Sequence, residues 1–118
     1  MLLRALVAIA LAVLTTAADA DSFIKRVPCG YQQITAIGTA SAVSLSVPTP
    51  AACGGVVGFA VITAEAQALR YRDDGTPPTS TVGMPVPVNT PLQYEGNLSA
   101  IQFIAQTTGA TLDVLYYR

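Results

Sequence analysis

The sequence predicts an all-β fold, namely an antiparallel β-sandwich or jelly-roll-like barrel of about seven strands after an N-terminal signal-like helix. Short apolar or alternating segments recur at intervals of about ten residues. Glycines and prolines, nine and eight of the 118 residues, stand between these segments and end them. Helix-forming patterns are weak everywhere after residue 20.

The first twenty residues have the pattern of a secretory signal peptide. A basic start at Arg4 precedes the uncharged apolar run 5–14 and the small-x-small sequence Ala18-Asp19-Ala20. A run of ten residues is too short to cross a bilayer, which takes about 20. We therefore expect a signal peptide at 1–20 and a single β-sandwich domain at 21–118, exported to the periplasm or the extracellular space if the signal is cleaved. An uncleaved N-terminal anchor or a buried helix is the alternative.

Turn signals separate seven segments of strand character. These are residues 31–37, 41–47, 55–63, 67–72, 92–95, 101–106 and 110–117. Segment 41–47 alternates cleanly, which is typical of a half-buried strand. Segment 55–63 is almost continuously apolar, which indicates a central strand covered on both faces. Residues 60–70 are the best helix candidate, but no N-cap precedes them, so we expect a strand with a bend near residues 64–66.

The last segment has two different faces. Alternate residues from Ala110 to Tyr116 form an apolar face, whereas the other face is polar at its start and apolar at Leu115 and Tyr117. Leu115 and Tyr117 either pack under a loop or form an exposed patch for a partner subunit.

Cys29 and Cys53 are the two cysteines of the chain. In a small exported domain an even number of cysteines usually forms disulfides, so we expect these two to pair. A zinc or redox site is disfavoured because the chain has no His and no C-x-x-C motif. We expect neither a metal nor another cofactor.

The charged residues are few and interleaved in sign, with a formal net charge of −1. Nucleic-acid binding needs several Lys or Arg gathered on one face, and a polybasic membrane patch needs the same. We therefore expect neither nucleic acid nor, after signal removal, a membrane as a partner.

The stretch ALRYRDDGTPPTSTVGMP, residues 68–85, is the most patterned part of the chain. Asp before Gly is typical of a turn, and the prolines of residues 76–91 predict a stiff extended loop that covers an edge or provides a contact surface. Arginines two apart share one strand face and lie near enough to the acids to pair with them, or to meet another subunit. The residues that we assign to a turn and protein contact are Arg70, Tyr71, Arg72, Asp73, Asp74 and Gly75. A ligand-binding loop is the alternative.

Catalysis has little support in the sequence. Neighbouring carboxylates on a strand point to opposite faces, whereas paired catalytic acids must flank one bond. The D-D-G-T spacing does not supply the alternating ligands of a calcium loop. A Ser or Cys nucleophile normally needs a base such as His, which the chain lacks. We expect no catalytic residue, and an enzyme would have to use Asp73, Asp74 or Glu95.

Residues 66–86 (AQALRYRDDGTPPTSTVGMPV) and 92–118 resemble a group of small proteins encoded in tailed-phage genomes and bacterial prophages. That group carries a similar R-(Y/W)-R-D-D-G-T-x-P-T-x-x-V-G-M-P segment and ends in a G-A-x-L-x-V-x-(Y/F)-Y strand. The resemblance covers about half of the chain after residue 20. It implies a β-sandwich virion accessory or head-decoration protein, with a homotrimer as one form of assembly.

The resemblance conflicts with the N-terminal half. Tailed phages assemble in the cytoplasm, where a cleaved signal has no place and disulfides rarely persist. Either the module has been adopted for export, or the N-terminal segment is not processed.

Taken together, the residues predict a non-catalytic structural or interaction protein whose partner is another protein or a second copy, and the resemblance implies a phage- or prophage-derived virion accessory. We expect the protein in the periplasm or outside the cell if the signal is cleaved, with the virion as the alternative location. The alternative is an exported binding module for a glycan or a peptide.

Overall fold

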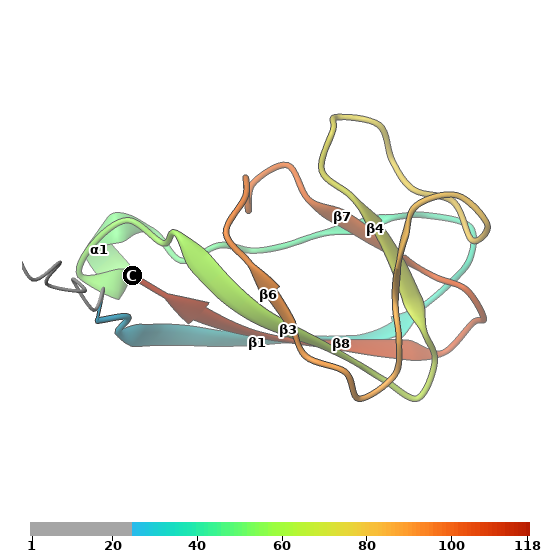
Figure 1. Cartoon of the computed structure of the whole chain (residues 1–118), viewed down its shortest axis with the longest axis horizontal. Helices are drawn as coiled ribbons and strands as arrows, with labels where there is room; N and C mark the ends of the chain where they lie inside the picture. The colour runs from blue at the N-terminus through green and yellow to red at the C-terminus, as the bar shows by residue number, and fades with distance from the viewer. Residues whose placement is uncertain (1–24) are drawn as a thin grey trace, which may run out of the picture.

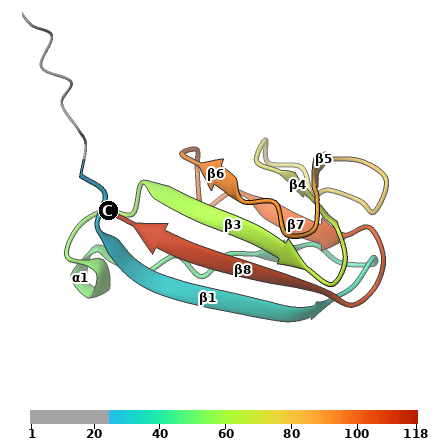
Figure 2. The same ribbon diagram turned by 60° about the horizontal axis from the view of Figure 1, so that its bottom comes forward.

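Two antiparallel four-stranded sheets face each other in the computed structural model, which describes residues 25–118 (Figures 1 and 2). One sheet has the order β1-β8-β3-β6 and the other the order β2-β7-β4-β5. The strands are β1 (Pro28–Ile37), β2 (Val43–Ser44), β3 (Phe59–Glu65), β4 (Leu69–Arg72), β5 (Met84–Val86), β6 (Leu92–Tyr94), β7 (Gln102–Ala105) and β8 (Ala110–Tyr117). The predicted all-β sandwich is confirmed, as two sheets rather than a closed barrel. The expected signal peptide lies outside the described residues.

Strand β8 lies inside its sheet and pairs with β1 on one side and β3 on the other. Its alternation fits this place, because Ala110, Leu112, Val114 and Tyr116 are all buried, as the sequence predicts. On β3, Ala60, Ile62 and Ala64 point to the same side and are fully buried. The central strands therefore present one continuous apolar surface to the second sheet.

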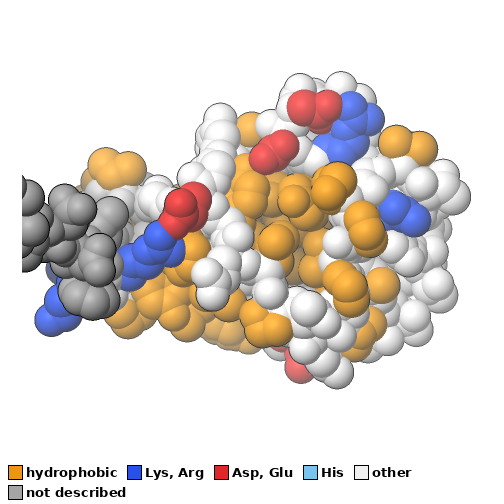
Figure 3. Space-filling view, viewed as in Figure 1, with side chains coloured by type: hydrophobic (Ala, Val, Ile, Leu, Met, Phe, Trp, Pro, Cys, Tyr) orange, Lys and Arg blue, Asp and Glu red, His pale blue; other side chains and the backbone are white. Residues whose placement is uncertain are grey.

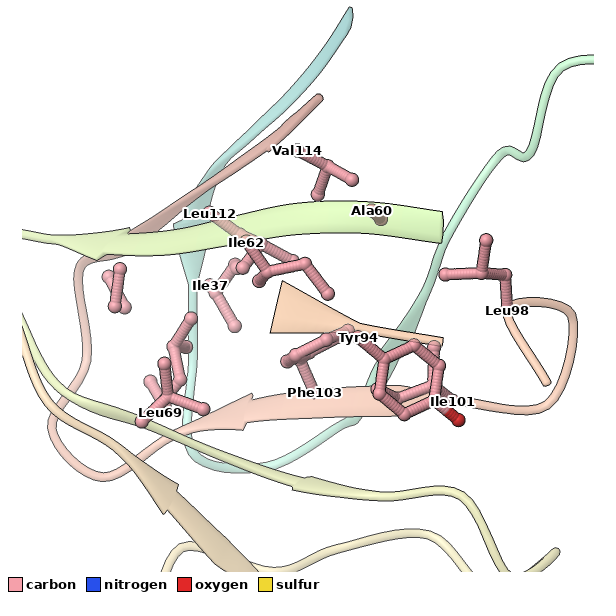
Figure 4. Packing of buried hydrophobic residues seen from close by; sticks show 14 of the residues in the cluster. Ile37, Ala60, Ile62, Leu69, Tyr94, Leu98, Ile101, Phe103, Leu112 and Val114 are labelled. Atoms are coloured by element: carbon pink, nitrogen blue, oxygen red, sulfur yellow. The ribbon is translucent and has the colours of Figure 1, made fainter. Parts of the chain in front are cut away.

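The core fills the space between the two sheets. Figure 4 shows Ile62 and Leu112 of one sheet above Phe103 and Leu69 of the other. Leu98 and Ile101, from the connection between β6 and β7, close one end of the cluster. Every buried side-chain nitrogen or oxygen among the described residues has a hydrogen-bond partner. The part of the sandwich that the structure describes thus has an apolar interior with no unpaired polar side-chain atom.

Two expected strands differ from the structure. The apolar run 55–63 forms a strand only from Phe59, and its outward residues Val61 and Thr63 are partly exposed, so the expectation of cover on both faces was wrong. In segment 41–47 only Val43 and Ser44 pair, as β2. Leu45 and Val47 still pack against the core, because the chain crosses from one sheet toward the other. Alternating burial therefore continues there without strand pairing.

Two elements were not expected. Strand β5 lies within the loop 76–91, at the edge of its sheet. An edge strand tolerates Pro85, because one side of the strand needs no backbone N–H donors. The short helix α1 (Pro50–Cys53) has Thr49 as N-cap and Gly54, with φ 76°, as C-cap. The bend expected near residues 64–66 is present: β3 ends at Glu65 and β4 begins in the other sheet after Ala66, whose φ is 67°.

The expected disulfide joins Cys29 at the start of β1 to Cys53 at the end of α1. It closes a sequence separation of 24 residues that contains β1 and β2. Cys53 is buried, whereas Cys29 is half-buried against the core. The bond therefore links the edge strand β1 to the connection between β2 and β3.

A hydrogen-bonded tyrosine lies at the inner face of β8. The hydroxyl of Tyr116 donates to Oε1 of Gln32 on β1 at 2.6 Å, and the same oxygen accepts the backbone N–H of Ser46 at 3.0 Å. Burial raises the pKa of Tyr116 to about 12. One amide oxygen thus joins β8, β1 and the crossing segment.

Replacing Cys29 and Cys53 with alanine is expected to lower the free energy of unfolding by about 3 kcal/mol, because the unfolded chain regains the entropy of an open loop of about 25 residues. Urea denaturation followed by circular dichroism measures this change. Reduction of the unmodified chain serves as the control and should give a similar shift. An unchanged denaturation midpoint in both would contradict the expectation.

Tyr116→Phe is expected to make the free energy of unfolding fall less steeply with rising pH above pH 10. The folded pKa of about 12 exceeds the unfolded value of about 10, so Tyr116 contributes stability that is complete below pH 10 and is lost as pH rises toward 12. The slope belonging to one such group is about 1.4 kcal/mol per pH unit. Unfolding free energies measured between these pH values should show a smaller slope in the variant. Equal slopes would mean that Tyr116 ionises in the folded chain as it does in the unfolded one.

Candidate functional site

Arg70 fixes the far end of the loop that follows β4. From β4 its Nε donates to the carbonyl of Ser80 at 3.1 Å and its Nη1 to the carbonyl of Gly83 at 3.0 Å. The sequence suggested that Arg70 pairs with an aspartate, but its partners are these two backbone carbonyls. A charged donor on a carbonyl makes a stronger hydrogen bond than a neutral one, so the loop is held firmly against the strand.

Arg72 and Asp74 form the expected ion pair at the turn. The guanidinium makes two contacts with the carboxylate, Nε to Oδ1 at 3.0 Å and Nη2 to Oδ2 at 2.5 Å. The backbone N–H of Thr76 donates to the same carboxylate at 3.4 Å, and Gly75 has φ 86°. Hydrogen bonding from Arg72 lowers the pKa of Asp74 below its ordinary value. Asp74 is exposed, so this pair defines the shape of the turn more than it stabilises the fold.

Asp73 faces a different partner, on the other sheet. Its Oδ2 accepts the hydroxyl of Tyr94 on β6 at 2.7 Å. Burial of the ring, and then the neighbouring carboxylate, raise the pKa of Tyr94 above its ordinary value. Tyr94 was not among the residues expected at this site, and its inward place in the LQYE strand was the only signal in the sequence. The contact joins the edge of one sheet to the turn of the other.

Gly96 leaves room for this tyrosine. A Cβ at position 96 would lie 2.3 Å from the hydroxyl oxygen of Tyr94. On the other side, the ring of Tyr94 meets Tyr71 edge-on at 6.3 Å between centroids, and Tyr71 lies 6.1 Å from Phe103. This aromatic row anchors the turn in the core, because Tyr71 belongs to the strand that leads into it.

A shallow hollow of about 410 Å³ lies beside the turn. Its lining, which we call the loop face, consists of Arg72, Asp73, Asp74, Val82, Gly83 and Met84. Figure 3 shows acidic and basic side chains side by side at the top of this view. Val82 and Met84 are 52% and 58% exposed, so the loop face presents two large apolar side chains to solvent.

Gly83 makes this display possible. It has φ 141°, and a Cβ there would lie 3.0 Å from the carbonyl oxygen of Tyr71. The backbone of the loop therefore approaches β4 closely at this residue, and the neighbouring apolar side chains turn outward. The glycine of the V-G-M-P sequence was the visible signal for this close approach.

Glu95 and Asp113 are engaged elsewhere. Glu95 forms an ion pair with Arg26. Asp113 lies on the outer face of the β1-β8-β3-β6 sheet, where it accepts hydrogen bonds from Tyr31 and Gln33. Among residues 25–118, no three His, Cys, Asp or Glu side chains lie close enough together to hold a metal ion.

Leu115 and Tyr117 lie on the same outer face and are partly exposed. Tyr117 packs on Phe59 at 5.5 Å between ring centroids, and the guanidinium of Arg26 lies 3.5 Å from the centre of the Phe59 ring. In the described part of the chain, no further layer covers this face (Figure 2).

No protein-family model, curated protein or solved structure matches the chain. In residues 25–118, no helix is long and apolar enough to cross a membrane. The disulfide is compatible with an exported location. Function must therefore be inferred from the loop face and its supports.

Arg70→Gln is expected to lower the free energy of unfolding by about 1 to 2 kcal/mol and to speed hydrogen exchange in residues 79–84, because two carbonyls lose a charged donor. Arg72→Gln is the matched control. It breaks an exposed pair, and its cost should stay below about 1 kcal/mol. Urea denaturation and exchange mass spectrometry would contradict the assignment if the two variants behaved alike.

Gly96→Ala is expected to cost about 1 to 3 kcal/mol, because the added methyl group displaces the buried Tyr94 ring and weakens its bond to Asp73. Gly38→Ala is the control, since a Cβ there meets nothing within 4 Å. Thermal unfolding measures both changes. A Gly96 variant as stable as the Gly38 variant would show that the ring moves without cost.

Proposed function

We propose that the chain is a non-catalytic interaction module whose loop face contacts another protein. The observation that carries this proposal is the exposure of Val82 and Met84 on either side of Gly83, whose carbonyl Arg70 binds. A preorganised loop loses little conformational entropy on binding, and exposed apolar side chains gain by leaving water. Charged groups at the rim of such a patch give orientation to the contact, and Arg72, Asp73 and Asp74 occupy that position.

The acids support a non-catalytic role. Asp73, Asp74 and Glu95 are each bound to a different partner, namely Tyr94, Arg72 and Arg26. A pair of catalytic carboxylates needs a shared space between them. Here each carboxylate instead serves a local contact that shapes the surface.

We place this module in a phage- or prophage-derived virion, as an accessory or decoration component. Support for the virion comes from the resemblance of residues 66–118, which contain all the loop-face residues. A decoration protein needs a stable small fold and a contact surface for a larger assembly, and the sandwich with its loop face supplies both.

An exported binding module is the second candidate, and the disulfide favours it. The hollow beside Arg72 and Asp74 offers charged and apolar groups side by side, as a glycan or a short peptide requires. Export would place the chain in the periplasm or outside the cell.

Photo-crosslinking distinguishes the two candidates. A benzoylphenylalanine in place of Val82 or Met84 is expected to capture one defined virion protein in cells that produce particles, whereas the same residue in place of Thr107 on the exposed β7–β8 turn should capture none. Loop-face positions that yield no more product than position 107 would refute the proposed contact.

The exported alternative has its own signature. Intact mass of the purified native protein should then show loss of residues 1–20 together with the two hydrogens of the disulfide, and a glycan array should give binding that Asp74→Asn weakens. Retention of the first residue in purified particles would exclude this alternative.

A further inference from the structure

Strand β1 differs from the other three edge strands of the sandwich. The edges are β1 and β6 in one sheet and β2 and β5 in the other. Proteins prevent unwanted pairing at sheet edges with short strands, prolines and charges. Strands β6, β5 and β2 have three, three and two residues, and β5 contains Pro85. Strand β1 has ten residues, so it alone is a long edge.

The middle of β1 lacks the usual protective features. Register irregularities lie near its two ends, between Pro28 and Gly30 and between Ile34 and Ile37. From Gly30 to Ile34 the register with β8 is unbroken, and neither Lys, Arg, Asp nor Glu occurs anywhere in the strand. Figure 2 shows β1 as the outermost strand of its sheet, and among residues 25–118 no strand pairs with its second side.

We infer that β1 pairs with β1 of a second copy of this chain, antiparallel and around a two-fold axis at Gln33. A strand edge presents a row of N–H and C=O groups that another strand satisfies, and an isologous contact places the same patch on both copies. The axis at Gln33 sets this glutamine opposite its own copy and Gln32 opposite Ile34 of the second copy, all within the regular part of the strand. None of these facing residues carries a charge, so no like charges meet.

The nearest acidic group is compatible with this pairing. Asp113 lies next to Gln33 on β8, and Tyr31 and Gln33 donate to its carboxylate at 2.7 and 2.9 Å. Its copy would lie three strand spacings away, about 14 Å. That distance exceeds the Debye length of about 8 Å at physiological ionic strength, so repulsion between the two carboxylates is screened.

The second copy leaves the loop face free. Strand β1 belongs to one sheet, whereas the loop face extends from Arg72 at the end of β4 to Met84 at the start of β5 in the other sheet. The pair therefore forms a continuous eight-stranded sheet with two loop faces. Each copy has one such edge, so the assembly closes as a dimer and does not extend to a trimer.

Gln33→Lys tests the inference, because it places two ammonium groups opposite each other at the axis. Within one copy the new lysine lies beside Asp113, so the fold itself should be unharmed. Gln93→Lys is the matched control: Gln93 is also exposed and lies on β6, the opposite edge of the same sheet. Light scattering and sedimentation should show a dimer for the unmodified chain, a dissociation constant raised by roughly tenfold or more in the Gln33 variant, and no change in the Gln93 variant.

A cysteine at the axis adds an independent measurement. Directly opposite residues in an antiparallel pair lie about 4.5 to 5.5 Å apart at Cα, within disulfide range. Gln33→Cys should therefore give a covalent dimer on mild oxidation, with the new link located by peptide mapping, and Gln93→Cys should not. A monomeric or trimeric unmodified chain, or a dimer that Gln33→Lys leaves intact while circular dichroism shows a native fold, would overturn the inference. None of these results would bear on the loop face.

Discussion

The pairing of β8 between β1 and β3 is the constraint on which the remainder of the sandwich depends. It joins the first strand of the described chain to the last and sets the register of both neighbours. With that register fixed, Ala60, Ile62, Leu112 and Val114 point to one side and become fully buried. The second sheet has an apolar surface to pack on only because β1, β8 and β3 turn their apolar residues to the same side.

Burial could be predicted from the sequence more reliably than pairing. The inward face of β8 followed directly from alternation, because a period of two places every second residue on one side. Segment 41–47 shows the limit of that argument: Leu45 and Val47 pack against the core although the chain there belongs to no ladder. A pattern of alternating burial predicts contact with the core, but it does not predict which strand, if any, pairs with the segment.

The candidate site shows a similar limit. The Arg72–Asp74 pair was expected because both partners are charged side chains close in sequence. The partners of Arg70 are backbone carbonyls, and any residue carries a carbonyl, so no sequence pattern marks Ser80 and Gly83 as acceptors. Tyr94 was missed because its contact with Asp73 spans 21 residues and depends on how the two sheets face each other.

The hydrogen bond between Tyr94 and Asp73 couples the spacing of the two sheets to the shape of the turn after β4. If the gap between the sheets widens at β6, Tyr94 pulls on the carboxylate of Asp73. Asp74 is the next residue, so its ion pair with Arg72 beside the hollow shifts as well. Force or heat that loosens this edge would thus distort the loop face before the interior unfolds.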